Sequence, residues 1–247
     1  MREARAALMA VMFLTRIPVP SLPDFRDEDL QAGARSFPAV GALVGVAQAL
    51  VLLGAALILP PMAAALLALA AALMITGAFH EDGLADAVDG LGGGYTRDRV
   101  LTIMKDSRIG SFGAAALIIA LALQAVALAE LVALPAAIIA AHAASRFVAL
   151  SIMATQDYVR DDDSARAKPL ATRIGAAGLA FAAIAVLLPA LFLPWQAACA
   201  GAGAMLVARL YWGWVCRRRL GGYTGDMLGA AQQISFTAGL LCVVAAS

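Results

Sequence analysis

The chain has 247 residues, of which 62% are hydrophobic and 14% are charged, and its formal net charge is +1. Charged residues make up about a quarter of an ordinary soluble domain, so this composition excludes a soluble globular protein. It predicts instead an all-α fold, a polytopic membrane helix bundle. The near-neutral charge gives no reason to expect nucleic-acid binding, and three scattered cysteines without metal-ligand spacing predict no metal site.

Seven apolar stretches approach the ~20 residues that a helix needs to cross a bilayer. In chain order they cover about residues 38–59, 62–79, 111–134, 136–155, 174–193, 195–215 and 228–246. Short connections with proline follow the first, third and fifth stretches, whereas the connections at 80–110, 156–173 and 216–227 are longer and polar. The sequence therefore predicts about seven transmembrane helices in one domain, residues 1–247, whose main catalytic segment is 80–110.

Lysine and arginine residues are distributed unequally between the two kinds of connection. All but two of the 18 lie before the first stretch or in the long connections, and the short connections contain none. Basic residues concentrate on the cytoplasmic side of membrane proteins. This pattern predicts a multi-pass membrane protein with its active site facing the cytoplasm and its C-terminus outside.

The second apolar stretch leads directly into an acidic segment that carries Asp82, Asp86 and Asp89. At about 100° per residue, these three side chains lie within about 60° of one another on one helix face. Carboxylates this close repel one another unless a cation lies between them, and Mg²⁺ or Mn²⁺ is the natural occupant. A solvated helix face is the alternative, but no basic residue is interleaved with the aspartates.

A glycine-rich and basic run follows the acidic segment. Glycine lets the backbone approach a phosphate closely, and basic side chains supply the charge that a pyrophosphate needs. Three glycines alone are typical of a flexible turn, but their position between an acidic face and basic residues predicts phosphate binding. The candidate substrate-binding residues are Arg97, Arg99, Lys105, Ser107 and Arg108. Asp106 is a catalytic candidate that could hold a basic neighbour or a second metal ion.

Two further places carry candidates for substrate binding. Arg146 lies near the middle of the predicted 136–155 span, where a charge usually faces the bundle interior, a cavity or an ion partner. The last polar connection supplies Gly222, Thr224 and Asp226. Asp226 could equally be the N-cap of the final helix, and a helix N-terminus beside a carboxylate can also hold a metal-bound phosphate ester.

These residues support a membrane-embedded, metal-assisted transferase or hydrolase that acts on a phosphorylated substrate from the cytoplasmic side. Two alternatives stay open. Asp86-x-x-Asp89-Gly90 begins like the signature of the CDP-alcohol phosphotransferases, but the Ala-Arg pair and the second aspartate pair of that signature are missing. A transporter-like binding protein is the other alternative, although the internal repeats usual in transporters do not occur.

The chain closely resembles the adenosylcobinamide-GDP ribazoletransferase family, also called cobalamin synthase. The resemblance spans nearly the whole chain in order, and its two central motifs are specific. The matching motifs are Phe13-Leu14-Thr15-Arg16-Ile17-Pro18, Phe37-Pro38-x-x-Gly41, Phe79-His80-x-Asp82-Gly83-Leu84-Ala85-Asp86-x-x-Asp89-Gly90, Met104-Lys105-Asp106-Ser107-Arg108-Ile109-Gly110, Ser145-Arg146 and Gly221-Gly222-x-Thr224-Gly225-Asp226-x-Leu228-Gly229-Ala230.

The resemblance implies the final assembly of the lower nucleotide loop of vitamin B12. A hydroxyl of α-ribazole, or of its 5′-phosphate, would attack the cobinamide-linked phosphorus of adenosylcobinamide-GDP and release GMP. Mg²⁺ on Asp82, Asp86 and Asp89 would bridge the pyrophosphate oxygens, and Asp89 or His80 would take the proton of the hydroxyl. The sequence sets neither the preferred acceptor nor the oligomeric state, and it allows a homo-oligomer.

Two segments depart from the family pattern. Gln232-Gln233 stands where the family often has a glutamate, so no acidic role is predicted there. The connection after Arg160 is acidic and lacks glycine in the stretch 161–166, so we assign no substrate to the segment 156–173.

Overall fold

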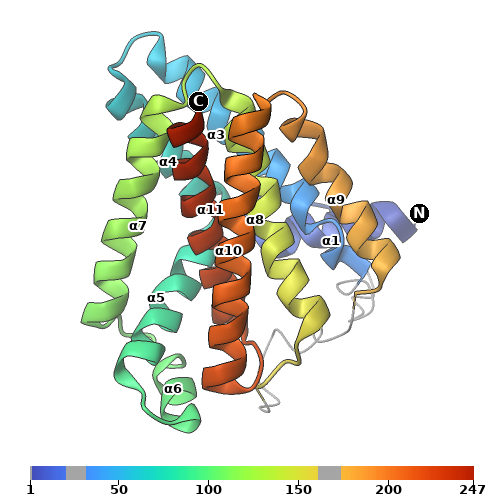
Figure 1. The fold of residues 1–247 in the computed structure, drawn as a ribbon, viewed down its shortest axis with the longest axis vertical. Helices are drawn as coiled ribbons and strands as arrows, with labels where there is room; N and C mark the ends of the chain where they lie inside the picture. Colours follow the sequence, from blue (N-terminus) through green and yellow to red (C-terminus); the bar gives the residue numbers. More distant parts are fainter. Residues whose placement is uncertain (1, 21–31, 161–173) are drawn as a thin grey trace.

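A computed structural model describes residues 2–20, 32–160 and 174–247 as a bundle of α-helices (Figure 1). The helices are α1 (Arg2–Leu14), α3 (Phe37–Ala56), α4 (Pro61–Thr76), α5 (Phe79–Gly93), α6 (Arg97–Ile103), α7 (Ser111–Glu130), α8 (Pro135–Thr155), α9 (Ala176–Ala190), α10 (Trp195–Leu220) and α11 (Gly225–Ala246). Within the described ranges, β-type pairing is limited to one isolated bridge between Tyr158 and Tyr223. The predicted all-α fold is confirmed, and the acidic stretch 161–166 lies outside the described residues.

Each predicted apolar stretch contains a helix, but not every helix has the length and the composition of a membrane span. Four described helices, α3, α7, α8 and α11, have the length and the apolar composition of a span, and the bent pair α4–α5 makes a fifth if it is one broken span. The apolar helix α9 has only 15 residues. The polytopic membrane fold is thus confirmed with four to five candidate spans, and the number of seven stays a prediction.

The connections separate to the two ends of the bundle. Figure 1 shows the short turns after α3, α7 and α9 at the same end as the C-terminus, whereas α6 and the connection from α10 to α11 lie at the opposite end. The basic residues of the described connections lie in this second group of connections. Helix α1 runs crosswise to the long helices. This sidedness is what the charge distribution predicts for a membrane protein.

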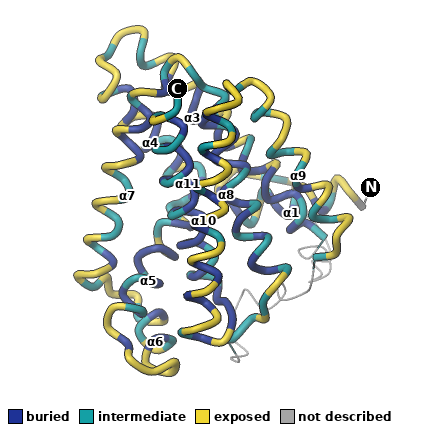
Figure 2. The backbone as a smooth tube through the Cα atoms, in the orientation of Figure 1, coloured by how far each residue is buried: buried dark blue, intermediate teal, exposed yellow. Residues whose placement is uncertain are grey.

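Helices α8 and α11 form the centre of the bundle, and α7 lies at its outside. Two thirds of the membrane-length window of α8 and of α11 is buried, against 28% for α7, and Figure 2 shows the same contrast. Large apolar side chains of α7, such as Ile118 and Ile119, are exposed on the outer surface. Such a surface suits contact with lipid chains, and polar residues on α8 and α11 are therefore removed from water.

A sharp break between α4 and α5 sets the direction of the acidic helix. The two helix axes differ by 89°, and the joint consists of Gly77 and Ala78, which have left-handed φ values of 65° and 56°. A side chain at position 77 would overlap the side chain of Arg16, so the joint needs glycine there. The backbone N–H of Arg16 donates to the carbonyl of Ile75 at 2.7 Å and braces the end of α4. A left-handed alanine costs about 1–2 kcal/mol, so packing must hold Ala78 in place.

Helices α5 and α11 cross at two glycines that face each other. A Cβ built on Gly83 would lie 3.2 Å from the Cα of Gly229, and a Cβ on Gly229 would lie 3.2 Å from the Cα of Gly83. Small residues let two helix backbones approach closely inside a membrane protein. The crossing lies one residue after Asp82 and three residues after Asp226, so it brings the acidic segment against the start of the last helix.

The separation of the connections predicts a defined topology. A reporter that is active only outside the cytoplasm should be active when fused after Pro61 or Ser247 and silent when fused after Tyr95 or Gly221. Comparable expression of the four fusions, checked by immunoblot, is the control. A silent reporter at Ser247 together with an active one at Tyr95 would reverse the orientation.

Candidate active site

Three aspartates from two helices converge at the crossing of α5 and α11. The charge of Asp86 is repelled by Asp226 and by Asp82 and is attracted by the guanidinium of Arg160. Asp82 is exposed, whereas Asp86 and Asp226 are partly buried. Asp82 and Asp86 both lie on the continuous helix α5, as a shared helix face requires. The last helix adds an aspartate that the helical spacing alone does not place beside them.

Arg160 is the cation of this acidic cluster. Its Nη2 lies 2.7 Å from Oδ2 of Asp226, and both side chains are 18% exposed. A short backbone pairing holds Arg160 in place, because Val159 donates its N–H to Tyr223 and Tyr223 donates its own to Asp157, both at 3.0 Å. Arg160 thus pairs with Asp226 and attracts the charge of Asp86, so the cluster has more carboxylates than guanidinium groups.

Asp89 makes different contacts from the other two aspartates of α5. It is buried, and its two carboxylate oxygens accept the backbone N–H groups of Gly110 at 2.7 Å and of Gly113 at 2.8 Å. These donors belong to the first turn of α7, where backbone N–H groups have no partner within the helix. A side chain at either glycine would overlap the carboxylate. Asp89 thus acts as a cap for α7 that is supplied by another helix.

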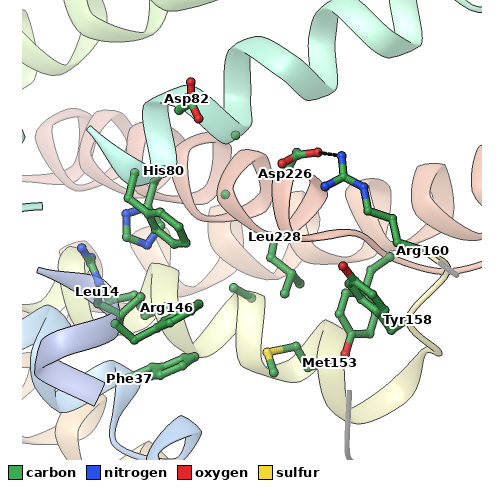
Figure 3. Close-up of a pocket in the computed structure, with 17 residues that line it drawn as sticks. Leu14, Phe37, His80, Asp82, Arg146, Met153, Tyr158, Arg160, Asp226 and Leu228 are labelled. Carbon is green, nitrogen blue, oxygen red and sulfur yellow. Dashed lines mark hydrogen bonds and ion pairs between the residues drawn. The ribbon is translucent and has the colours of Figure 1, made fainter. Parts of the chain in front are cut away.

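An apolar cavity of about 270 Å³ opens on one side of the aspartates. Figure 3 shows Asp82 and Asp226 across from Leu14, Phe37 and Met153 in this cavity, with the ion pair from Asp226 to Arg160 at one end. The remaining side chains that line it include Phe13, Phe79, His80, Arg146, Tyr158 and Leu228. The wall is mainly apolar, with charged groups at the end nearest the acidic cluster.

A second and larger cavity, of about 610 Å³, adjoins α5 as well. Its wall is more polar and holds Asp82, Asp86, Arg16, Ser107 and Thr76. Asp82 lines both cavities. The two spaces therefore meet at the acidic helix, an arrangement that can bring two substrates to one carboxylate.

Arg146 and His80 are both buried on the wall of the apolar cavity. The guanidinium of Arg146 donates to the carbonyl of His142 at 3.0 Å, and it interacts electrostatically with Glu81. His142 itself lies 2.7 Å from the amide oxygen of Gln48, which makes it a satisfied histidine of the bundle interior. Among the described residues, Nε of Arg146 has no hydrogen-bond partner. Arg146 thus lines the cavity and keeps one buried N–H group without a hydrogen-bond partner among the described residues.

Two of the predicted phosphate-binding residues lie away from both cavities. Arg97 donates to the carbonyls of Leu220 at 3.0 Å and of Val159 at 3.1 Å, so it ties α6 to the end of α10. Arg99 is exposed on the same short helix and lines neither cavity. In this arrangement Arg97 has a structural role, and the assignment of Arg99 to the substrate stays a prediction.

The loop after α6 presents an exposed ion pair. Arg108 donates to both carboxylate oxygens of Asp106, and the closest contact is 2.6 Å. The side-chain hydrogen bonds from Arg108, followed by its backbone N–H, lower the pKa of Asp106 to about 2. Asp106 therefore stays ionised throughout the neutral pH range and cannot exchange protons there. Lys105 is exposed beside the pair, and Ser107 and Ile109 of this run line the polar cavity.

The last polar connection positions Asp226 through its neighbours. A side chain at Gly222 would overlap the carbonyl of Asp157, so glycine permits the bridge that holds Arg160. Thr224 is the N-cap of α11, and its hydroxyl accepts the N–H of Met227 at 3.2 Å. The alternative that Asp226 caps this helix is therefore wrong, and its carboxylate is available to the acidic cluster.

Several residues of the site carried no sequence prediction. Arg160 lies in a segment to which no substrate was assigned, and Arg16 appeared only within a matching motif. Glu81 adjoins Asp82 but points away from the aspartate face, and it accepts a hydrogen bond of 2.6 Å from Gln233. Each of these contacts joins segments far apart in the chain, so local spacing contains no signal for it.

The described residues contain no ready group of three or more histidine, cysteine, aspartate or glutamate side chains arranged to hold a metal ion. The chemistry of the cluster nevertheless fits a hard cation, because Asp82, Asp86 and Asp226 carry oxygen ligands and face one arginine. Asp89 differs, since both of its oxygens already accept backbone hydrogen bonds. Metal binding by all three aspartates of α5 stays a prediction.

Comparison with known proteins identifies the family. A family model described as cobalamin-5-phosphate synthase matches residues 6–244. The chain belongs to the cobalamin-5-phosphate synthase family. Proteins named adenosylcobinamide-GDP ribazoletransferase are similar to it over most of both chains. One from Leptothrix cholodnii is 46% identical over 244 residues, covering 94% of this chain and 92% of the relative.

Further relatives with the same name show that the similarity is not restricted to one source. One from Ralstonia nicotianae is 46% identical, covering 95% of this chain and 93% of the relative. One from Vibrio cholerae is 42% identical, covering 92% of this chain and 88% of the relative. No solved structure matches the chain. The predicted family is confirmed by these matches.

The different surroundings of Asp82 and Asp89 give a prediction about stability. Asp89→Asn replaces one acceptor oxygen by an amide donor that faces a backbone N–H, and we expect it to lower the free energy of unfolding by about 1–3 kcal/mol. Asp82→Asn is the matched control, because Asp82 is exposed. Thermal unfolding of both variants in detergent measures the difference. Equal melting temperatures for Asp89→Asn and the wild type would refute the capping role.

The ion pair between Arg160 and Asp226 gives a second prediction. Arg160→Met leaves a partly buried carboxylate beside two others, so we expect it to lower the melting temperature. Arg160→Met combined with Asp226→Asn should restore part of the loss, because the unpaired charge is removed as well. Additive effects of the two substitutions in the double-mutant cycle would show that the pair does not couple the two elements.

Proposed function

We propose that this chain is an adenosylcobinamide-GDP ribazoletransferase of the bacterial inner membrane, with its site facing the cytoplasm. The observation that carries the proposal is the position of Asp82, which lines a polar cavity and an apolar cavity at once. A transfer between two unlike substrates needs such a meeting point. The names of the relatives supply the two substrates, adenosylcobinamide-GDP and a ribazole.

The reaction transfers a phosphoryl group between two oxygen atoms. An acceptor hydroxyl oxygen forms a bond to the cobinamide-linked phosphorus, the bond from that phosphorus to the bridging oxygen breaks, and GMP leaves with the bonding electrons. The hydroxyl proton passes to a base. Of the two predicted bases, His80 lines the apolar cavity, whereas both oxygens of Asp89 are held by α7. We therefore propose that His80 accepts the hydroxyl proton and that Asp89 has a positioning role.

The donor pyrophosphate fits the larger, polar cavity. Arg16 and Ser107 lie on its wall and can neutralise and orient phosphate oxygens. Lys105 and Arg108 are exposed on the loop that carries Ser107 and are placed to meet the nucleotide as it enters. Phosphoryl transfer depends on positioning and charge neutralisation more than on covalent chemistry. A wall that carries both carboxylates and an arginine provides both.

Mg²⁺ is the cofactor that this proposal requires. Asp82 and Asp86 would hold it together with phosphate oxygens of the donor, and Asp226 is the third carboxylate within electrostatic reach. Bound Mg²⁺ would neutralise the pyrophosphate and stabilise the departing GMP. The supporting observation is the excess of carboxylates over arginine in the cluster.

Purified protein in detergent tests the proposal directly. GMP release from adenosylcobinamide-GDP should require both α-ribazole, or its 5′-phosphate, and Mg²⁺. The matched comparison replaces the donor by CDP-diacylglycerol, which a CDP-alcohol type phosphotransferase would use. Turnover of CDP-diacylglycerol without turnover of the cobinamide donor would reject the proposed function. Uptake of a cobinamide into proteoliposomes without GMP release would support the transporter alternative instead.

Manganese binding separates the roles of the aspartates. Titration with Mn²⁺ followed by electron paramagnetic resonance should show weaker binding in Asp82→Asn and Asp86→Asn, by at least about tenfold. In Asp89→Asn, metal binding should remain near that of the wild type at temperatures where the variant is folded. Loss of Mn²⁺ binding in folded Asp89→Asn would restore Asp89 to the metal site. Unchanged binding in all three variants would remove the site from α5.

A further inference from the structure

The apolar cavity beside Asp82 has a size and a lining that select a small aromatic group. Its volume of about 270 Å³ is slightly below the ~300–1,000 Å³ that is usual for drug-sized ligands. Aromatic rings form much of its wall, since Phe13 stacks on Phe37 with centroids 5.7 Å apart and meets Phe79 edge-on at 5.4 Å. Met153 and Leu228 contribute further apolar surface.

The two substrates of the proposed reaction differ strongly in size and charge. A corrin joined to a guanosine diphosphate is far too large for this space, and its pyrophosphate needs cations and a metal ion. A ribazole is a benzimidazole nucleoside, which combines a flat, bicyclic aromatic base with a polar sugar. The base is the part of either substrate that gains most from an apolar, aromatic wall.

We propose that the cavity binds the benzimidazole base of the ribazole acceptor and that Arg146 recognises the unsubstituted nitrogen of that base. This inference rests on the proposed function and names the subsite of its second substrate. With the base among Phe13, Phe37 and Met153, the sugar lies toward the charged end of the cavity. Asp82 and Asp226 are at that end, so an acceptor hydroxyl reaches the acidic cluster.

Arg146 supplies a polar contact in addition to the acidic end of the cavity. It is buried on the cavity wall, and within the described part of the chain its Nε has no hydrogen-bond partner. The unsubstituted ring nitrogen of a benzimidazole nucleoside is a hydrogen-bond acceptor. A buried donor without a partner gains when a ligand supplies an acceptor, and it disfavours a ligand that does not.

Filling the cavity tests the location of the base. Ala149 lies on the wall of the cavity, whereas Ala144 lies on the same helix and lines a different apolar space. Ala149→Met should raise KM for α-ribazole at least tenfold and leave KM for adenosylcobinamide-GDP within twofold. Ala144→Met is the matched control and should change neither constant. An increase of KM for the cobinamide donor alone would overturn the assignment.

Binding without turnover separates this inference from the proposed function. Equilibrium dialysis of labelled α-ribazole against protein in detergent should show binding that Ala149→Met weakens. Such binding without GMP release would keep the subsite and reject the transferase. GMP release together with unaltered α-ribazole binding in Ala149→Met would keep the transferase and reject the subsite. The subsite would also be rejected if the wild type retained a lipid that Ala149→Met loses, while the binding of α-ribazole stayed unaltered.

A pair of acceptors tests Arg146 without relying on a variant. Ribosylindole has the shape of the benzimidazole nucleoside but carries a C–H group in place of the acceptor nitrogen. The wild type should prefer the benzimidazole compound by at least about tenfold in kcat/KM. In Arg146→Met the preference should fall to near unity. Equal use of the two acceptors by the wild type would overturn the role of Arg146.

Discussion

The close crossing of α5 and α11 is the constraint on which the site depends. Gly83 and Gly229 leave no side chain between the two backbones, so Asp226 comes within electrostatic reach of Asp82 and Asp86. A Cβ at either position would come within 3.2 Å of the facing backbone, so the two helices would have to move apart. The 89° break before α5 also helps to assemble the site, because it turns the acidic helix away from the direction of α4 and across the bundle. A left-handed alanine at the break is the local cost of that turn.

The aspartates of α5 have two kinds of role, one chemical and one structural. Asp82 and Asp86 face cavities, whereas Asp89 accepts two N–H groups from the first turn of α7. Residue spacing on a helix fixes the angle between side chains but not the element that each side chain meets. One aspartate-rich motif can therefore carry a cation site at its start and a helix cap at its end.

The sequence predicted the helical class and the separation of the connections well, because both depend on local spacing or composition. It predicted the partners of the charged residues poorly, because those depend on chain crossings. Arg97 was expected to bind phosphate, yet it donates to the carbonyls of Leu220 and Val159. Arg160 received no role, yet it neutralises Asp226. Backbone pairing between residues 157–159 and Tyr223 brings Arg160 to Asp226, and the sequence of neither segment indicates this pairing.

Gln233, one of the two glutamines that depart from the family pattern, has a physical explanation in the buried polar chain beneath the site. Gln233 donates to Glu81 at 2.6 Å, and its amide oxygen accepts from Gln124 at 2.7 Å. Only a group with both a donor and an acceptor can make these two bonds at once, and an ionised glutamate has no donor. A glutamate at this position would also place a second negative charge against Glu81 in the bundle interior. The amide therefore holds Glu81 without repulsion and, through the backbone of α5, fixes the neighbouring Asp82 at the junction of the two cavities.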